Sequence, residues 1–76
     1  MLYRITHHKH LHGDEYAIDG RTVHENLSER AAIRQLQQIA ISYTAGGWTT
    51  RIDGYVLTAS IKGGAIKTLY RVYAQD

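Results

Sequence analysis

The chain has 76 residues, a net charge of +2 at neutral pH, five histidines and no cysteine. A chain of this length is expected to form one domain, residues 1–76, and to bury only about 60% of the surface that its unfolded form exposes, which argues against a deep pocket with a full catalytic apparatus. The absence of cysteine excludes a disulfide framework and a thiolate metal site. The mild positive charge permits a nucleic-acid partner without demanding one.

Two strands are predicted before the helix, over Leu2–Leu11 and Glu15–Ile18, with a turn at His12-Gly13 between them. The dipeptide Asp19-Gly20 either ends the second strand or bends it toward Val23. The alternation of side chains in this register predicts one common face. That face carries Tyr3, Ile5, His7, Tyr16 and Ile18.

A single helix is predicted within Asn26–Gly47. Ser28 is a favourable N-cap, and Glu29 places a carboxylate in the first turn. Gly46-Gly47 supplies residues that can adopt positive φ beyond the last turn. Apolar residues recur at three- and four-residue spacing, which indicates one buried stripe. The stripe consists of Ala32, Ile33, Leu36, Ile39, Ala40 and Tyr43.

Three further strands are predicted after the helix, over Trp48–Ile52, Tyr55–Ile61 and Ala65–Ala74, with turns at Asp53-Gly54 and Gly63-Gly64. The first turn pairs Thr50 with Leu57, and the second pairs Leu57 with Tyr70 and Ile61 with Ile66. Both registers select the same buried face, which favours an antiparallel meander. The predicted fold is therefore an α+β two-layer sandwich in ββ-α-βββ order, with one helix packed on a four- to five-stranded antiparallel sheet.

The segment from His7 to His12 is rich in histidine. On a strand, His8, His10 and His12 point to the same side, and imidazoles at that spacing can converge on a metal ion, with Asp14, Glu15 or Asp19 as an oxygen ligand. The competing interpretation is a solvated strand whose polar face happens to carry histidines. A third is pH sensing, because imidazoles titrate near pH 6.5.

Catalysis is not indicated. Ser28, Ser42 and Ser60 lie in no nucleophile-elbow context, and no glycine-rich loop leads from a strand into a helix. No nucleophile, base and orienting group can be assembled from the sequence. We therefore expect a protein that is not an enzyme and needs no cofactor.

The face of the meander away from the helix is the candidate binding surface. It combines cations with apolar and aromatic groups and carries no carboxylate in the predicted register. Its members are Thr49, Arg51, Val56, Thr58, Ser60, Lys62, Lys67, Leu69, Arg71 and Tyr73. The residues expected to contact a partner are Arg51, Lys62, Lys67, Leu69, Arg71 and Tyr73. Such a face fits an acidic protein surface or single-stranded nucleic acid, and it equally fits an ordinary solvated sheet.

Self-association is a further expectation. The strand Ala65–Ala74 is long and has few features that protect an edge, so it could pair with a second copy of the chain. A homodimer would also bury Leu69 and Tyr73.

No apolar run approaches the roughly 20 residues that span a bilayer, and no charged-then-apolar leader opens the chain. We expect a soluble, cytoplasmic protein with no membrane association.

In its format the chain resembles the small accessory proteins that phages encode, of which anti-CRISPR inhibitors are the best-known group. The resemblance consists of a short cysteine-free domain with a terminal hairpin, one helix, a meander and no catalytic motif. It implies a stoichiometric inhibitor that occupies the surface of a host defence complex in the cytoplasm of the host cell. The first hypothesis is therefore a protein-binding module, the second a nucleic-acid-binding module on the same face, and the third a histidine-rich metal-binding or pH-responsive protein.

Overall fold

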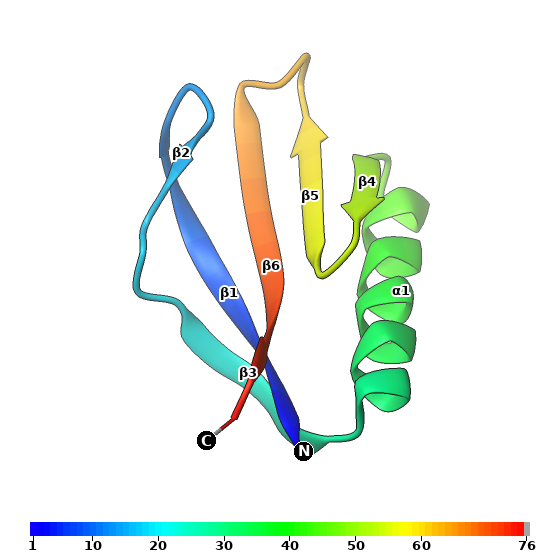
Figure 1. The fold of residues 1–76 in the computed structure, drawn as a ribbon. Helices are drawn as coiled ribbons and strands as arrows, with labels where there is room; N and C mark the ends of the chain where they lie inside the picture. The colour runs from blue at the N-terminus through cyan, green and yellow to red at the C-terminus, as the bar shows by residue number, and fades with distance from the viewer. Residues whose placement is uncertain (76) are drawn as a thin grey trace.

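The computed structural model describes residues 1–75 and contains one helix packed on an antiparallel sheet of six strands (Figure 1). In chain order the elements are β1 (Tyr3–His12), β2 (Glu15–Tyr16), β3 (Arg21–Leu27), α1 (Glu29–Ala45), β4 (Thr49–Asp53), β5 (Val56–Ile61) and β6 (Ile66–Ala74). The predicted α+β class is confirmed. The order is βββ-α-βββ, because the chain beyond Gly20 forms a strand of its own, β3, instead of ending the first hairpin.

The strands follow one another across the sheet in the order β2-β1-β6-β5-β4, and β3 also pairs with β1. The strand β6 is therefore central: it pairs with β1 from Tyr3 opposite Ala74 to Lys9 opposite Thr68, and it pairs with β5 on its other side. The expectation that the final strand is an edge was wrong. Because both of its sides are occupied within the chain, β6 cannot pair with a second copy.

Helix α1 begins and ends where its signals predict. Ser28 is the N-cap, and its Oγ accepts a hydrogen bond of 3.1 Å from the backbone N–H of Ala31. Beyond the last turn, Gly47 adopts a φ of 89°, which glycine does without strain. The predicted stripe faces the sheet, where burial of apolar surface holds the two layers together. The core consists of Ala32, Leu36 and Ala40 of the helix with Ile5, Leu57 and Val72 of the sheet.

The register of the meander is right in one hairpin and shifted in the other. Between β5 and β6, Leu57 pairs with Tyr70 as predicted. Between β4 and β5, Ile52 pairs with Leu57 instead of Tyr55, because the turn starts at Gly54, which takes a φ of 61°. The shift amounts to two residues, so every side chain stays on its predicted face.

The first hairpin differs from the prediction by an odd number of residues. The turn lies at Gly13-Asp14, with Gly13 at a φ of 55°, and His10 pairs with Tyr16. A one-residue slip moves a strand's side chains to the opposite face, so Tyr16 does not share the face of Ile5. Ile18, which was also predicted on that face, lies in the loop after β2 with 93% of its surface exposed.

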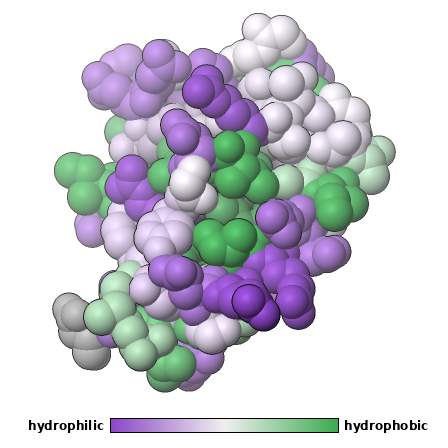
Figure 2. Space-filling view, turned by 45° about the vertical axis from the view of Figure 1, so that its right-hand side comes forward, coloured by the Kyte–Doolittle hydropathy of each residue, from purple (hydrophilic) through white to green (hydrophobic). Residues whose placement is uncertain are grey.

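The helix covers one face of the sheet, and no second layer of secondary structure from residues 1–75 covers the other (Figure 1). On the side that turns α1 toward the viewer, apolar side chains gather near the centre of the surface and hydrophilic ones surround them (Figure 2). Within residues 1–75, no helix has the length and apolar character to cross a membrane.

Candidate functional site: the open face of the sheet

We call the sheet surface away from α1 the open face. Its side chains alternate along each strand with those that pack under the helix, such as Ile5, Leu57 and Val72. The open face is formed by Arg4, Thr6 and His8 of β1, Lys67, Leu69, Arg71 and Tyr73 of β6, Val56, Thr58 and Ser60 of β5, and Thr49, Arg51 and Asp53 of β4.

The structure brings most of the predicted binding residues onto this face. Arg51, Lys67, Leu69, Arg71 and Tyr73 all lie on it. Lys62 does not: it is the first residue of the β5–β6 turn, exposed and at a φ of 56°, so its position is beyond the end of the face.

Arg71 and Tyr73 form a fixed unit on the open face. The Arg71 guanidinium lies over the Tyr73 ring at 5.6 Å from its centroid, and Nη1 donates a hydrogen bond of 3.2 Å to the Tyr73 hydroxyl. Such a cation–π contact contributes about 0.5–1 kcal/mol at an exposed site. Arg4 lies directly opposite Tyr73 on β1 and adds a second guanidinium nearby. Two cations and one aromatic ring are thus presented together.

Lys67, another cation of the open face, contacts the tip of the β1–β2 hairpin. Its Nζ lies 3.6 Å from Asp14 Oδ1 and donates a hydrogen bond of 3.2 Å to the Gly13 carbonyl. The tip of the β1–β2 hairpin therefore reaches over the open face and neutralises this cation. The prediction of a face without carboxylates was wrong, because Asp14 reaches it from the hairpin and Asp53 belongs to β4 rather than to a turn.

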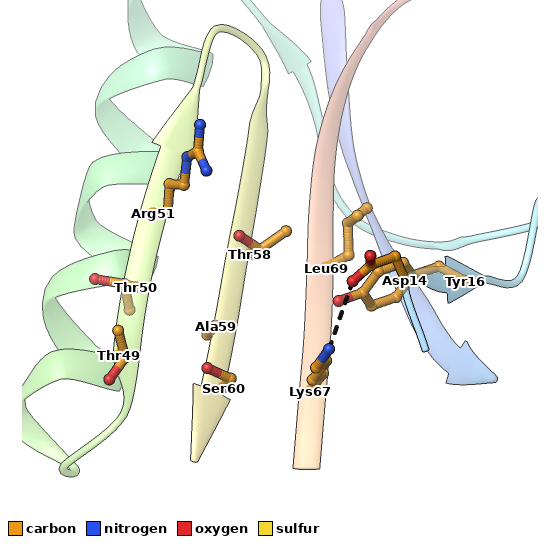
Figure 3. A pocket seen from close by; sticks show the side chains of 10 residues that line it. All are labelled: Asp14, Tyr16, Thr49, Thr50, Arg51, Thr58, Ala59, Ser60, Lys67 and Leu69. Carbon is orange, nitrogen blue, oxygen red and sulfur yellow. Dashed lines mark ion pairs between the residues drawn. The ribbon is translucent and has the colours of Figure 1, made fainter. Parts of the chain in front are cut away.

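A hollow of about 460 Å³ lies on the open face between the hairpin tip and β4 (Figure 3). Arg51 stands on the β4 side, Asp14 and Tyr16 reach in from the hairpin side, and Leu69 lies between them. We call this space the hollow. Its lining consists of Asp14, Tyr16, Thr49, Thr50, Arg51, Thr58, Ala59, Ser60, Lys67 and Leu69.

The three histidines that were considered as metal ligands each have a different partner. His8 is buried, its Nδ1 donates to the Ala17 carbonyl at 2.8 Å, and its Nε2 lies 2.7 Å from the Thr6 hydroxyl. His10 Nε2 donates to the Gly13 carbonyl at 2.9 Å, and His12 Nε2 lies 3.5 Å from Glu15 Oε2. In the part of the chain that the structure describes, no three His, Asp or Glu side chains are grouped to hold a metal ion.

His7 and Tyr70 lie on the helix side of the sheet, behind the open face. Their rings stack at 4.5 Å, and His7 Nε2 is hydrogen-bonded to the Thr68 hydroxyl. Burial lowers the pKa of His7 from its ordinary 6.5, and the neighbouring His8 and Arg21 lower it further. Burial and the hydrogen bond with Tyr43 raise the pKa of Tyr70. These groups are accordingly uncharged at neutral pH and stabilise the layer beneath the site.

Sequence reasoning missed Asp14, Tyr16 and Arg4 as members of this surface. Tyr16 was placed on the wrong face by the one-residue slip, and Asp14 was considered as a turn residue and as a possible metal ligand, not as a member of the binding surface. A turn at Gly13-Asp14 pairs His12 with Glu15 and brings Asp14 to the hairpin tip, but the β-bulge between His10 and His12, which pairs His10 with Tyr16 and moves Tyr16 to the open face, has no signal in the sequence.

Comparison of the chain with protein-family models, with curated proteins and with solved structures finds no match. The function is therefore argued from the open face.

Proposed function

We propose that this protein is a non-enzymatic binding module that engages a protein partner through the open face of its sheet. The observation that carries the proposal is the Arg71–Tyr73 unit, in which Arg71 is exposed and Tyr73 is half-buried, with Arg4 beside it. Arginine and tyrosine are the residue types that most often dominate binding energy at protein interfaces. A guanidinium that is already held over a ring loses little conformational freedom when a partner binds.

Two contacts favour a protein over a nucleic acid as the partner. The Arg71 guanidinium lies 5.6 Å from the Tyr73 ring centroid and bonds its hydroxyl, so it competes for this ring with the bases that single-stranded nucleic acids stack on aromatic side chains. Asp14 lies at ion-pair distance from Lys67, which reduces the positive charge that this lysine offers to phosphates. Binding of nucleic acid on this face remains the second hypothesis.

In this proposal the protein acts by occupying a surface of its partner, as its resemblance to small phage-encoded inhibitors of host defence complexes implies. The partner should present carboxylates and apolar groups, because the open face offers arginines and the apolar side chains of Val56, Leu69 and Tyr73.

The test is an affinity capture from host lysate with untagged protein coupled to a resin, with and without nuclease. We expect a protein partner that is still recovered after nuclease treatment. Arg71→Ala and Tyr73→Ala should each reduce its recovery at least about tenfold. Arg34→Ala, an exposed arginine on α1, is the matched control and should leave recovery unchanged. Recovery of nucleic acid alone, falling log-linearly with salt by roughly 0.7–0.9 per neutralised phosphate, would favour the second hypothesis.

A further inference from the structure

We propose that the hollow on the open face is a receptor for one large apolar side chain of the partner, and that an adjacent carboxylate of the same partner segment pairs with Arg51. This inference rests on the proposed function and goes further, because it names the segment: a short, extended, acidic peptide stretch with a single apolar anchor.

Two surface contacts and one ring contact link the hairpin side of the hollow to the sheet. Lys67 links the hairpin tip to β6 through Asp14 and the Gly13 carbonyl, at 3.6 and 3.2 Å. The Tyr16 ring is half-buried and lies 5.3 Å from the ring of His10. A preformed concave site loses less entropy on binding than one that must assemble.

The floor of the hollow suits an apolar anchor. Leu69 is half-buried between the two sides, so its exposed part forms an apolar surface within the hollow. The volume of about 460 Å³ falls within the range of sites that enclose small organic groups, about 300–1,000 Å³. The hydroxyls of Thr49, Thr58 and Ser60 line the β4–β5 side of the hollow and can bond the backbone of an extended segment.

Charge identifies the flanking groups of the partner segment. Among residues 1–75, the one carboxylate that lines the hollow is that of Asp14, which lies at ion-pair distance from Lys67. Arg51 has no carboxylate of residues 1–75 at ion-pair distance. Its charge therefore makes the β4 side of the hollow positive. Arg71 lies two strands away and two positions along, roughly 12 Å from Arg51 by standard sheet spacing, and can meet a second carboxylate of an extended segment.

The experiment is an amide chemical-shift titration of the intact protein with three capped pentapeptides. The first has a central phenylalanine flanked by aspartates, the second replaces the phenylalanine with serine, and the third replaces the aspartates with lysines. We expect the first to shift the amides of Tyr16, Thr58 and Leu69 and to bind at least about tenfold more tightly than either of the others. Equal binding of the first two peptides, or shifts outside the hollow, would overturn the proposal.

Variants test the two named contacts. Arg51→Ala and Leu69→Ala should each weaken binding of the first peptide at least about fivefold, and Arg34→Ala on α1 should change it less than about twofold. The same spectra report whether each variant is folded. If a captured partner depends on Arg71 and Tyr73 but not on Arg51 and Leu69, the hollow is not the receptor and the proposed function stands. If it depends on none of the four, the proposed function fails as well.

Discussion

The imidazole ring of His8 occupies the space in which a side chain at Gly20 would lie. A Cβ at Gly20 would be 2.7 Å from His8 Nε2 and 2.9 Å from Thr6 Cβ. The same ring bonds the Ala17 carbonyl, so His8 holds the segment between β2 and β3 against the sheet from two directions. The buried histidine of this segment is therefore a structural support for the loop that carries Ile18 beside the open face.

Replacing Gly20 by alanine should destabilise the protein. The added methyl group overlaps a buried ring and a backbone-attached carbon, and such overpacking typically costs about 1–3 kcal/mol. Urea unfolding followed by tryptophan fluorescence measures the loss. Gly46→Ala is the matched control, because its Cβ would be 3.5 Å or more from its neighbours and should change the unfolding free energy by less than about 0.5 kcal/mol.

The Tyr55 hydroxyl should titrate well above the usual pKa of 10. It donates a hydrogen bond to Glu29, which also accepts one of 3.3 Å from Tyr3, and these contacts raise the pKa of Tyr55 to about 12. The carboxylate stabilises the protonated phenol, so Glu29→Gln should lower this pKa toward 10. The measurement is the pH dependence of the ring-carbon NMR signals. An unchanged Tyr55 titration in the variant would show that Glu29 does not act on it.

Stability should fall as the pH is lowered through the range in which His7 titrates. The folded state lowers the pKa of His7 below the unfolded value of 6.5, so the unfolded state binds the proton more readily. The contribution of neutral His7 is complete above pH 6.5 and is lost as pH falls through the folded pKa. His7→Gln should flatten the slope of unfolding free energy against pH below 6.5. His12→Gln, at an exposed position, is the control and should keep the slope.

Asn26 and Gln75 should be energetically coupled. Gln75 Oε1 accepts from the Asn26 N–H at 2.6 Å, and Gln75 Nε2 donates to Asn26 Oδ1 at 3.1 Å. A double-mutant cycle of Asn26→Gly and Gln75→Ala should give a coupling of about 0.5–1.5 kcal/mol in urea unfolding. Asn26→Ala should cost more than Asn26→Gly, because Asn26 has a φ of 60° that alanine adopts with strain. Additive single effects would contradict the coupling.

Local signals were sufficient for the helix and the meander. Ser28 and Gly47 mark the helix boundaries by backbone requirements that few other residues meet, and the apolar stripe follows from periodicity alone. In the meander, the misplaced turn at Gly54 left the faces unchanged because the error was even. Arg51, Leu69, Arg71 and Tyr73 were consequently assigned to the correct face from the sequence.

Long-range pairing could not be predicted in the same way. The sequence contains nothing local that tells β1 to pair with β6, since that choice depends on how whole strands compete for neighbours. The first hairpin shows the sensitivity of such assignments, because one residue of error moved Tyr16 off the binding face. The hollow could not be predicted from the sequence for the same reason, because it is formed where the hairpin tip approaches Lys67.

The central position of β6 also determines when the domain can fold. The strand β6 lies between β1 and β5 and pairs with both. The residues before Ile66 therefore cannot form a continuous sheet without it. The contact between Thr6 and Arg71 spans 65 positions in the chain, and closing such a loop is what slows folding in sheets of this kind. Fragments that stop before Ile66 should therefore remain unfolded, and addition of β6 should allow the whole domain to fold in one step.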